Sequence, residues 1–164
     1  MRFIQLMTAA LLLMLCGCAG ERAVFSEHGE GAAMRNAVCV DIRIIEEGGT
    51  LARKTCYLPA EIEMAQAVAE RFLEENSEVL SKETEIRAAV AEGTAMLDVS
   101  GLPLLEDIVM ERAFLGALVL SMTELSDISQ VSFLFDGEPL AALPQGAPCY
   151  GTFSAEDFPE DNTP

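Results

Sequence analysis

ALVLSMTELSDISQVSFLFDGEP, residues 117–139, passes from a predicted helix into a predicted strand. Residues 114–120 are almost continuously apolar, and this run is too short to span a bilayer, so it predicts a deeply buried core helix. The helix is expected over about residues 103–125, opened by Pro103. Residues 131–135 alternate between the two faces of a strand, and Asp136-Gly137 is a typical turn dipeptide that closes it.

Upstream of this stretch, residues 86–99 predict a β-hairpin around Glu92-Gly93. Centring the register on that turn places Arg87 opposite Asp98, and Ile86 opposite Val99. Opposite charges then share one face of the hairpin and apolar side chains share the other, which supports this register.

The first half of the folded region predicts another hairpin and a helix. Residues 38–44 and 51–57 alternate in polarity on either side of a turn at residues 46–49. Centring this hairpin between Glu47 and Gly48 pairs Cys39 with Cys56. An apolar stripe at helical spacing follows, opened by Pro59 and ended near Asn76.

These elements predict an α+β fold. Their order is helix, strand, strand, helix, strand, preceded by a β-hairpin. This order predicts an antiparallel sheet with the two helices packed on one face. We expect one domain over residues 37–143, in which residues 140–143 could add a short return strand. Residues 18–36 are interpreted as a tether, and residues 144–164 as a Pro-rich acidic tail.

Three blocks of the chain resemble the GerMN (sporulation and spore germination) domain family: residues 94–100, 117–125 and 131–139. The block that ends in Asp-Gly-Glu-Pro is the most distinctive. The resemblance covers about residues 50–143 and implies a fold like that of ring-building motifs. It also implies a lipid-anchored or secreted protein of endospore-forming bacteria, active in spore-envelope assembly or germination. The family has no established catalytic residues, so none are carried over.

The N-terminus predicts a lipoprotein signal peptide over residues 1–17. Arg2 precedes an apolar run, and Leu15-Cys16-Gly17-Cys18 resembles the lipobox of bacterial lipoproteins. That resemblance implies cleavage before Cys18 and lipid attachment to its sulfur, which would hold the protein on the extracytoplasmic side of the cell membrane. The alternative is an ordinary signal peptide cleaved after Ala19 or Gly20, with Cys18 incidental.

The charge balance excludes a nucleic-acid partner. The chain has 27 acidic and 10 basic residues, a formal net charge of −17. No basic cluster is present to neutralise phosphates. The predicted partners are therefore the membrane, through Cys18, and envelope proteins of unknown identity, with self-association possible.

No combination of residues predicts catalysis, a cofactor or a metal site. His28 is the single histidine and lies in the predicted tether, so it has no rigid scaffold on which to activate a nucleophile. No His/Cys spacing fits zinc. Neighbouring carboxylates are abundant throughout this acidic chain and are best explained as solvated surface. We predict that the protein is not an enzyme.

Cys39 and Cys56 are the candidate disulfide. A two-residue turn would place them in a non-hydrogen-bonded cross-strand pair, about 4.5 Å apart at Cα, as a disulfide requires. A three-residue turn would shift the register and separate them. Two reduced cysteines, or a bond to Cys149, whose role is open, are the alternatives.

The predicted function is that of a lipid-anchored protein-interaction domain, which presents a sheet edge or a helix face in spore-envelope assembly or germination. The alternative is a lipoprotein that binds a solute or a cell-wall fragment. That reading would need a concave apolar site with convergent polar groups.

Overall fold

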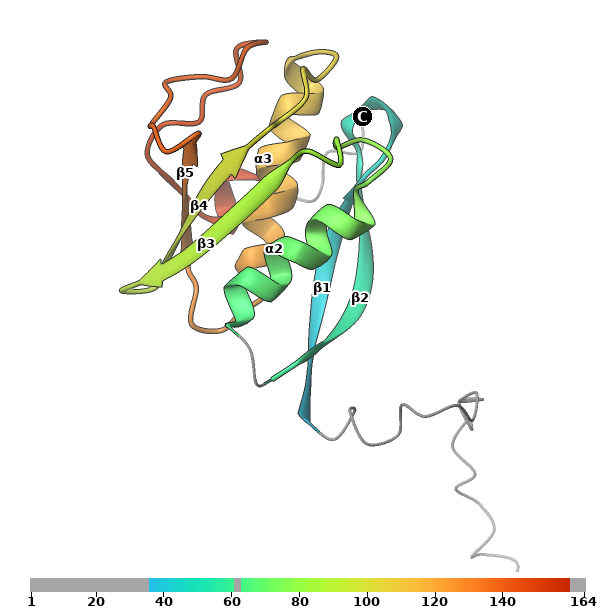
Figure 1. Ribbon diagram of the computed structural model, residues 1–164, viewed down its shortest axis with the longest axis vertical. Helices are drawn as coiled ribbons and strands as arrows, with labels where there is room; N and C mark the ends of the chain where they lie inside the picture. Colours follow the sequence, from blue (N-terminus) through green and yellow to red (C-terminus); the bar gives the residue numbers. More distant parts are fainter. Residues whose placement is uncertain (1–35, 61–62, 160–164) are drawn as a thin grey trace, which may run out of the picture. The chain divides into compact units, whose positions relative to one another are not determined.

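The computed structural model describes residues 36–60 and 63–159 (Figure 1). Cys18 and His28 lie outside the described residues, as do the predicted signal peptide and almost all of the predicted tether. The elements, in chain order, are β1 (Ala37–Ile45), the 3-10 turn η2 (Glu47–Gly49), β2 (Leu51–Pro59), α2 (Met64–Glu75), β3 (Glu85–Ala91), β4 (Thr94–Ser100), α3 (Ile108–Met122), β5 (Gln130–Phe135), β6 (Thr152–Phe153) and η3 (Ala155–Asp157).

The predicted α+β class is confirmed, but the strands form two sheets. β1 and β2 form a two-stranded sheet, and the second sheet has the strand order β3-β4-β5-β6. β4 and β5 are parallel, whereas the other pairs are antiparallel. The parallel pair arises because α3 crosses back over the sheet between β4 and β5. The expectation of one antiparallel sheet is therefore wrong.

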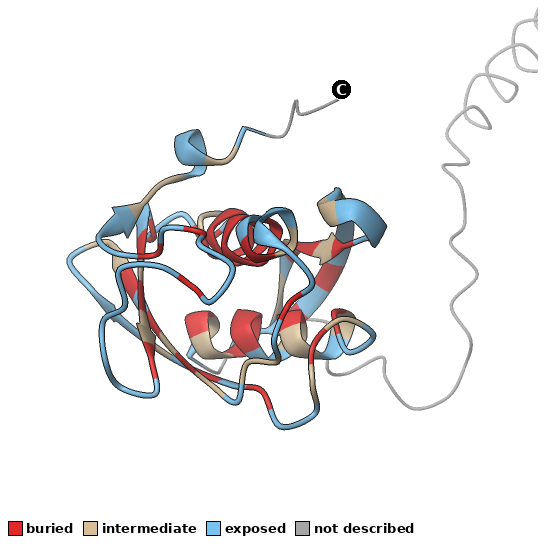
Figure 2. Ribbon diagram, turned by 90° about the horizontal axis from the view of Figure 1, so that it is seen from above, coloured by how far each residue is buried: buried red, intermediate tan, exposed pale blue. Residues whose placement is uncertain are grey.

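The core lies around α3. Figure 2 shows this helix almost end-on and mostly buried, between the β1–β2 hairpin and the four-stranded sheet. Phe114, Leu118 and Val119 are fully buried. The Phe114 ring also meets Phe72 of α2 edge-on, at 6.1 Å between centroids. The apolar run at residues 114–120 is thus a core helix, as predicted.

The predicted β3–β4 register is confirmed at every named pair, including Arg87 opposite Asp98. Glu92 and Gly93 form the turn with φ values of 50° and 77°. Positive φ at both central residues is typical of the type I′ turn, whose twist matches that of the strands. Local turn chemistry and alternation therefore suffice to set this hairpin.

The predicted β1–β2 register is wrong by one residue. Cys39 lies opposite Tyr57, and Cys56 lies opposite Val40. The last pair is Ile45 with Leu51, so the connecting loop is centred on Gly48 and not between Glu47 and Gly48. A slip of one residue exchanges the two faces of a strand. Tyr57 is accordingly 61% exposed.

Both helices begin later than predicted. Pro59 ends β2, and α2 starts only at Met64. α3 starts at Ile108 because the Asp107 side chain caps it, accepting a hydrogen bond from the Met110 backbone N at 2.9 Å. The predicted end of α2 is confirmed, with Asn76 as its C-cap.

The Pro-rich acidic tail predicted for residues 144–164 is part of the domain over most of its length. Ala147 and Cys149 are buried, and β6 pairs with β5. Phe153 packs against Phe133 and Phe158, with 5.8 Å between ring centroids in each pair. Aromatic contacts thus hold this segment to the domain up to Pro159, and only residues 160–164 of the predicted tail lie outside the described part. The predicted return strand at 140–143 is reduced to an isolated bridge between Ala142 and Pro148.

Candidate interaction surface

The three cysteines of the described domain are unbonded. Cys39 is exposed, whereas Cys56 and Cys149 are buried. The predicted Cys39–Cys56 disulfide is contradicted because the one-residue shift in register places the two side chains on opposite faces of the hairpin.

The two buried thiols are poor nucleophiles. Burial raises the pKa of Cys56, and the nearby Glu75 carboxylate raises it further. Burial likewise raises the pKa of Cys149, with a second contribution from Glu111. Arg71 and Lys54 lower the pKa of Cys56 but do not offset the rise, so both thiols are protonated at neutral pH and unreactive as nucleophiles.

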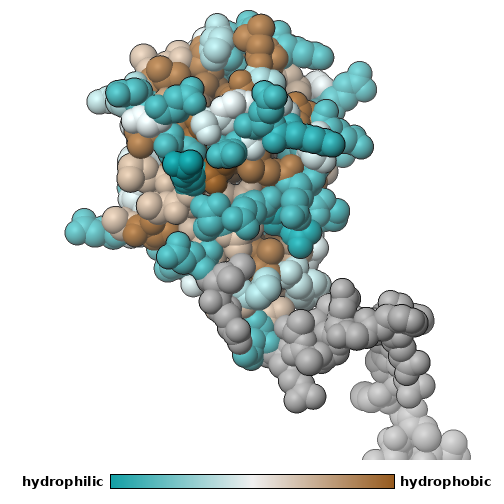
Figure 3. Space-filling model, viewed as in Figure 1, coloured by the Kyte–Doolittle hydropathy of each residue, from teal (hydrophilic) through white to brown (hydrophobic). Residues whose placement is uncertain are grey.

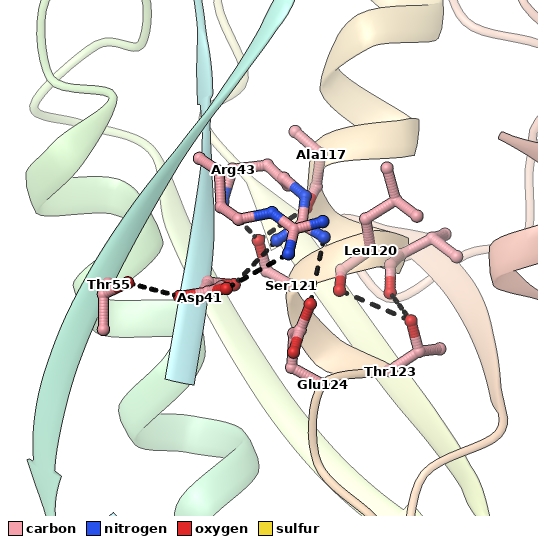
Figure 4. A network of polar contacts seen from close by, with 10 residues as sticks. Asp41, Arg43, Thr55, Ala117, Leu120, Ser121, Thr123 and Glu124 are labelled. Atoms are coloured by element: carbon pink, nitrogen blue, oxygen red, sulfur yellow. Dashed lines mark hydrogen bonds and ion pairs between the residues drawn. The ribbon is translucent and has the colours of Figure 1, made fainter. Parts of the chain in front are cut away.

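A polar network joins β1 to α3 through Arg43 (Figure 4). The Arg43 backbone N donates to Ser121 Oγ at 2.9 Å, and Arg43 Nη2 lies 2.9 Å from Glu124 Oε1. Ser121 Oγ in turn donates to the Ala117 carbonyl at 2.7 Å. The Arg43 side chain is 5% exposed, so this ion pair is partly buried. The polar groups of this network hold the β1–β2 hairpin against α3.

Residues 36–60 and 63–159 contain no candidate metal centre. No group of three or more His, Cys, Asp or Glu side chains there could hold a metal ion. Every buried side-chain nitrogen or oxygen in that part has a hydrogen-bond partner, so none is left aimed at a ligand. None of the described helices is both long enough and apolar enough to cross a membrane.

A shallow groove of about 450 Å³ lies along the edge of β3, and we call it the β3 groove. Hydrophobic surface near the leftmost tip of the molecule, where the β3–β4 hairpin turns, is visible in Figure 3. Leu125 and Ile128 are buried beneath the groove, and Val90 beside them is 44% exposed. The two charged residues that line the β3 groove are both acidic. The lining is Glu63, Met64, Ala65, Gln66, Ala88, Ala89, Val90, Leu125, Asp127 and Ile128.

Gln66 of α2 covers part of the β3 edge. Its Nε2 donates to the Ile86 carbonyl at 3.2 Å, and its Oε1 accepts from the Ala88 backbone N at 2.8 Å. One side-chain amide thus makes the pair of bonds that a residue of a neighbouring strand would make. Our sequence reasoning missed Gln66, because no local pattern shows that α2 lies against β3.

A family model described as "Germane: Sporulation and spore germination" matches residues 43–141. The chain belongs to the Germane family. This membership confirms the resemblance found in the sequence, and the family is a sporulation and germination domain and not a known enzyme family.

Solved structures share the Germane fold of this chain. The tandem GerMN domains of the sporulation protein GerM from Bacillus subtilis match with a TM-score of 0.59 and 23% identity, over 74% of this chain and 47% of that one. The chain therefore spans about half the length of the tandem structure. The first GerMN domain of the same protein matches with a TM-score of 0.59 and 22% identity, over 73% of this chain and 99% of that one.

A putative lipoprotein from Clostridium perfringens matches with a TM-score of 0.53 and 16% identity, over 74% of this chain and 87% of that one. No curated protein matches the chain in sequence. At these identities, the likeness to solved structures establishes the fold alone.

Proposed function

We propose that this Germane-family protein is a lipid-anchored extracytoplasmic interaction domain that acts in spore-envelope assembly or germination. The observation that carries the proposal is the family match over residues 43–141, in a domain whose four-stranded sheet has β3 as an edge strand. An unpaired strand edge is a surface on which another chain can add. The protein acts by contact and not by catalysis.

The second support is the lipobox-like sequence that ends at Cys18. In this proposal the diacylglycerol on Cys18 holds the chain at the outer face of the cell membrane, and envelope proteins are its partners. Stable anchoring requires at least two acyl chains or an equivalent second signal, which a lipoprotein anchor provides. Self-association remains a prediction.

Two neighbouring cysteines provide a matched test of the anchor. Cys18→Ala should abolish incorporation of labelled palmitate and release the protein from the membrane fraction of sporulating cells. Cys16→Ala should leave both unchanged, because Cys16 would be removed with the signal peptide. Palmitate incorporation retained in Cys18→Ala would overturn the proposed anchor.

The biological role is tested separately by deletion of the gene. Loss of the protein should lower the count of heat-resistant spores or slow their germination, and the wild-type gene should restore both. The Cys18→Ala gene should restore them poorly, because the domain would no longer be held at the membrane. Normal sporulation and germination in the deletion strain would contradict the proposed role.

A further inference from the structure

We propose that the β3 groove binds an extended, basic and apolar segment of a partner protein, which adds to β3 as a further strand, and that Gln66 guards this edge. The proposal rests on the proposed function as an interaction domain, and it identifies the surface and the chemistry of the partner.

The direction of the β3 backbone defines the open edge. In an antiparallel ladder the N–H and C=O of one residue point to the same side. Ala88 N bonds to Gln66 and not to β4, so Ile86, Ala88 and Val90 direct their backbone groups away from β4. Gln66 satisfies two of these groups. Among the described residues, no hydrogen bond reaches Val90 on that side.

The groove beside this edge suits one kind of strand. Val90 is 44% exposed over a floor that includes Leu125 and Ile128, so an apolar side chain of an added strand would be covered there. Glu63 and Asp127 are the charged groups of the lining, and no basic residue accompanies them. Alternating apolar and basic side chains match both features.

Charge makes a second copy of this chain a poor occupant. The net charge of the chain is −17, and pairing the same edge of two copies would bring both sets of groove carboxylates together. Like charges placed face to face disfavour an interface. A basic partner segment gains from the same field, which also accelerates its association.

Gln66 restricts the pairing of an incoming strand with β3. Its amide reproduces two bonds of a neighbouring strand, so an incoming strand can pair freely at Val90 but must displace Gln66 to reach Ile86 and Ala88. Natural proteins protect exposed edges by such local devices. The Gln66 side chain therefore disfavours pairing with an arbitrary strand. A strand whose side chains also fit the β3 groove gains enough contacts to displace it.

The test uses the full-length protein in detergent and a synthetic peptide of alternating Lys and Val with blocked ends. The comparison peptides have alternate backbone N-methyl groups, which prevent strand pairing, or Glu in place of Lys. Binding is measured by fluorescence anisotropy, and the site is mapped by amide chemical shifts. The Lys–Val peptide should bind and shift residues 63–66 and 88–91, whereas both comparison peptides should bind at least about ten-fold more weakly.

Variants of the β3 edge distinguish strand pairing, with Gln66 as a competitor, from non-specific binding of the peptide. Gln66→Ala should tighten peptide binding by at least about five-fold, because it removes the two hydrogen bonds that compete with an incoming strand. Glu70→Ala is the matched control, because Glu70 Oε1 accepts from Gln66 Nε2 at 3.1 Å and, among the described residues, makes no hydrogen bond or ion pair with β3. Val90→Pro removes the outward N–H without removing a bond to β4, and should abolish binding.

If Val90→Pro lowers the melting temperature, the charge variant Asp127→Lys replaces it and should weaken binding of the Lys–Val peptide. Equal binding of all three peptides, or binding unchanged by both Gln66→Ala and the edge variant, would overturn the proposal. Neither outcome affects the Cys18 or spore tests, so the proposed function would stand or fall separately.

Discussion

Asn76 joins α2 to β1 through one buried side-chain amide. Its Oδ1 accepts from the Ile45 backbone N at 2.7 Å, and its Nδ2 donates to the carbonyls of Arg43 at 3.1 Å and Phe72 at 2.9 Å. The residue is 2% exposed, so water cannot replace these bonds. The end of α2 is thereby fastened to the end of β1.

Replacing Asn76 should therefore be costly. Asn76→Ala leaves the Ile45 N–H and two carbonyls without this partner, and should lower the free energy of unfolding by about 2–3 kcal/mol. Ser77→Ala, at the exposed neighbouring position, should change it by less than about 0.5 kcal/mol. Urea unfolding followed by circular dichroism measures both, and equal values for the two variants would refute this role.

The thiols should differ in reactivity. Iodoacetamide at about pH 8 should alkylate the exposed Cys39 long before Cys56 and Cys149, which are buried and have raised pKa values. Peptide mapping by mass spectrometry measures alkylation at each cysteine. The control is the same measurement in urea, where the three alkylation rates should converge. Early labelling of Cys149 in the folded protein would contradict its placement.

The raised pKa values of Cys56 and Cys149 also make the stability of the protein depend on pH. Because the folded pKa of Cys56 and Cys149 lies above the ordinary value of 9.0, their contribution to stability is present below that pH. It is lost as the pH rises through the folded values, since the unfolded thiols ionise first.

At the scale of elements, the β3–β4 turn contains a correctable strain. Glu92 has a φ of 50°, in a region that Asn occupies more readily than Glu. Glu92→Asn should raise the free energy of unfolding by about 0.5–1 kcal/mol. Glu106→Asn, which removes the same charge at another exposed position, should have no such effect in thermal unfolding. A gain from both variants would assign the effect to charge.

The C-terminal segment, residues 152–159, is held to α3 at Gly116. A Cβ added at Gly116 would lie 2.7 Å from Phe158 Cδ1 and 3.4 Å from Phe158 Cβ. Arg112 also lies over the Phe158 ring, at 5.9 Å from its centroid. The segment therefore depends on the absence of a side chain at one helix position.

Gly116→Ala should displace Phe158 and accelerate amide hydrogen exchange over residues 152–159. The helix itself gains up to about 1 kcal/mol from the better propensity of Ala. This gain offsets the lost contact with Phe158, so the melting temperature should change little. Phe158→Ala should cause the same acceleration, and adding Gly116→Ala to it should have no further effect. Exchange in Gly116→Ala as slow as in the parent protein would contradict this contact.

At the scale of the whole molecule, the net charge of −17 opposes compaction. Salt screens this repulsion, because the Debye length falls from about 30 Å at 0.01 M to about 8 Å at 0.15 M ionic strength. The melting temperature should therefore rise over that range. A variant that carries Glu47→Lys, Glu78→Lys and Glu106→Lys should show a smaller rise, and a melting temperature that falls with salt in both proteins would contradict this account.

The sequence alone determined those features that neighbouring residues decide together. The register of β3 and β4 follows from alternation and from the Glu92-Gly93 turn, and the burial of α3 follows from its continuous apolar run. The turn after β5 follows in the same way, since Phe135 and Glu138 pair across Asp136-Gly137. The family could also be identified, because its blocks consist of such local patterns.

Features that depend on distant segments follow only from the packing of the folded chain. The β1–β2 register, which separates Cys39 from Cys56, buries Cys56 and Leu58 of β2 in the core. The contact of Gln66 with Ile86 spans 20 positions of sequence, and that of Arg43 with Ser121 spans 78. Periodicity describes which face of an element is apolar, whereas the packing of whole elements determines what that face meets.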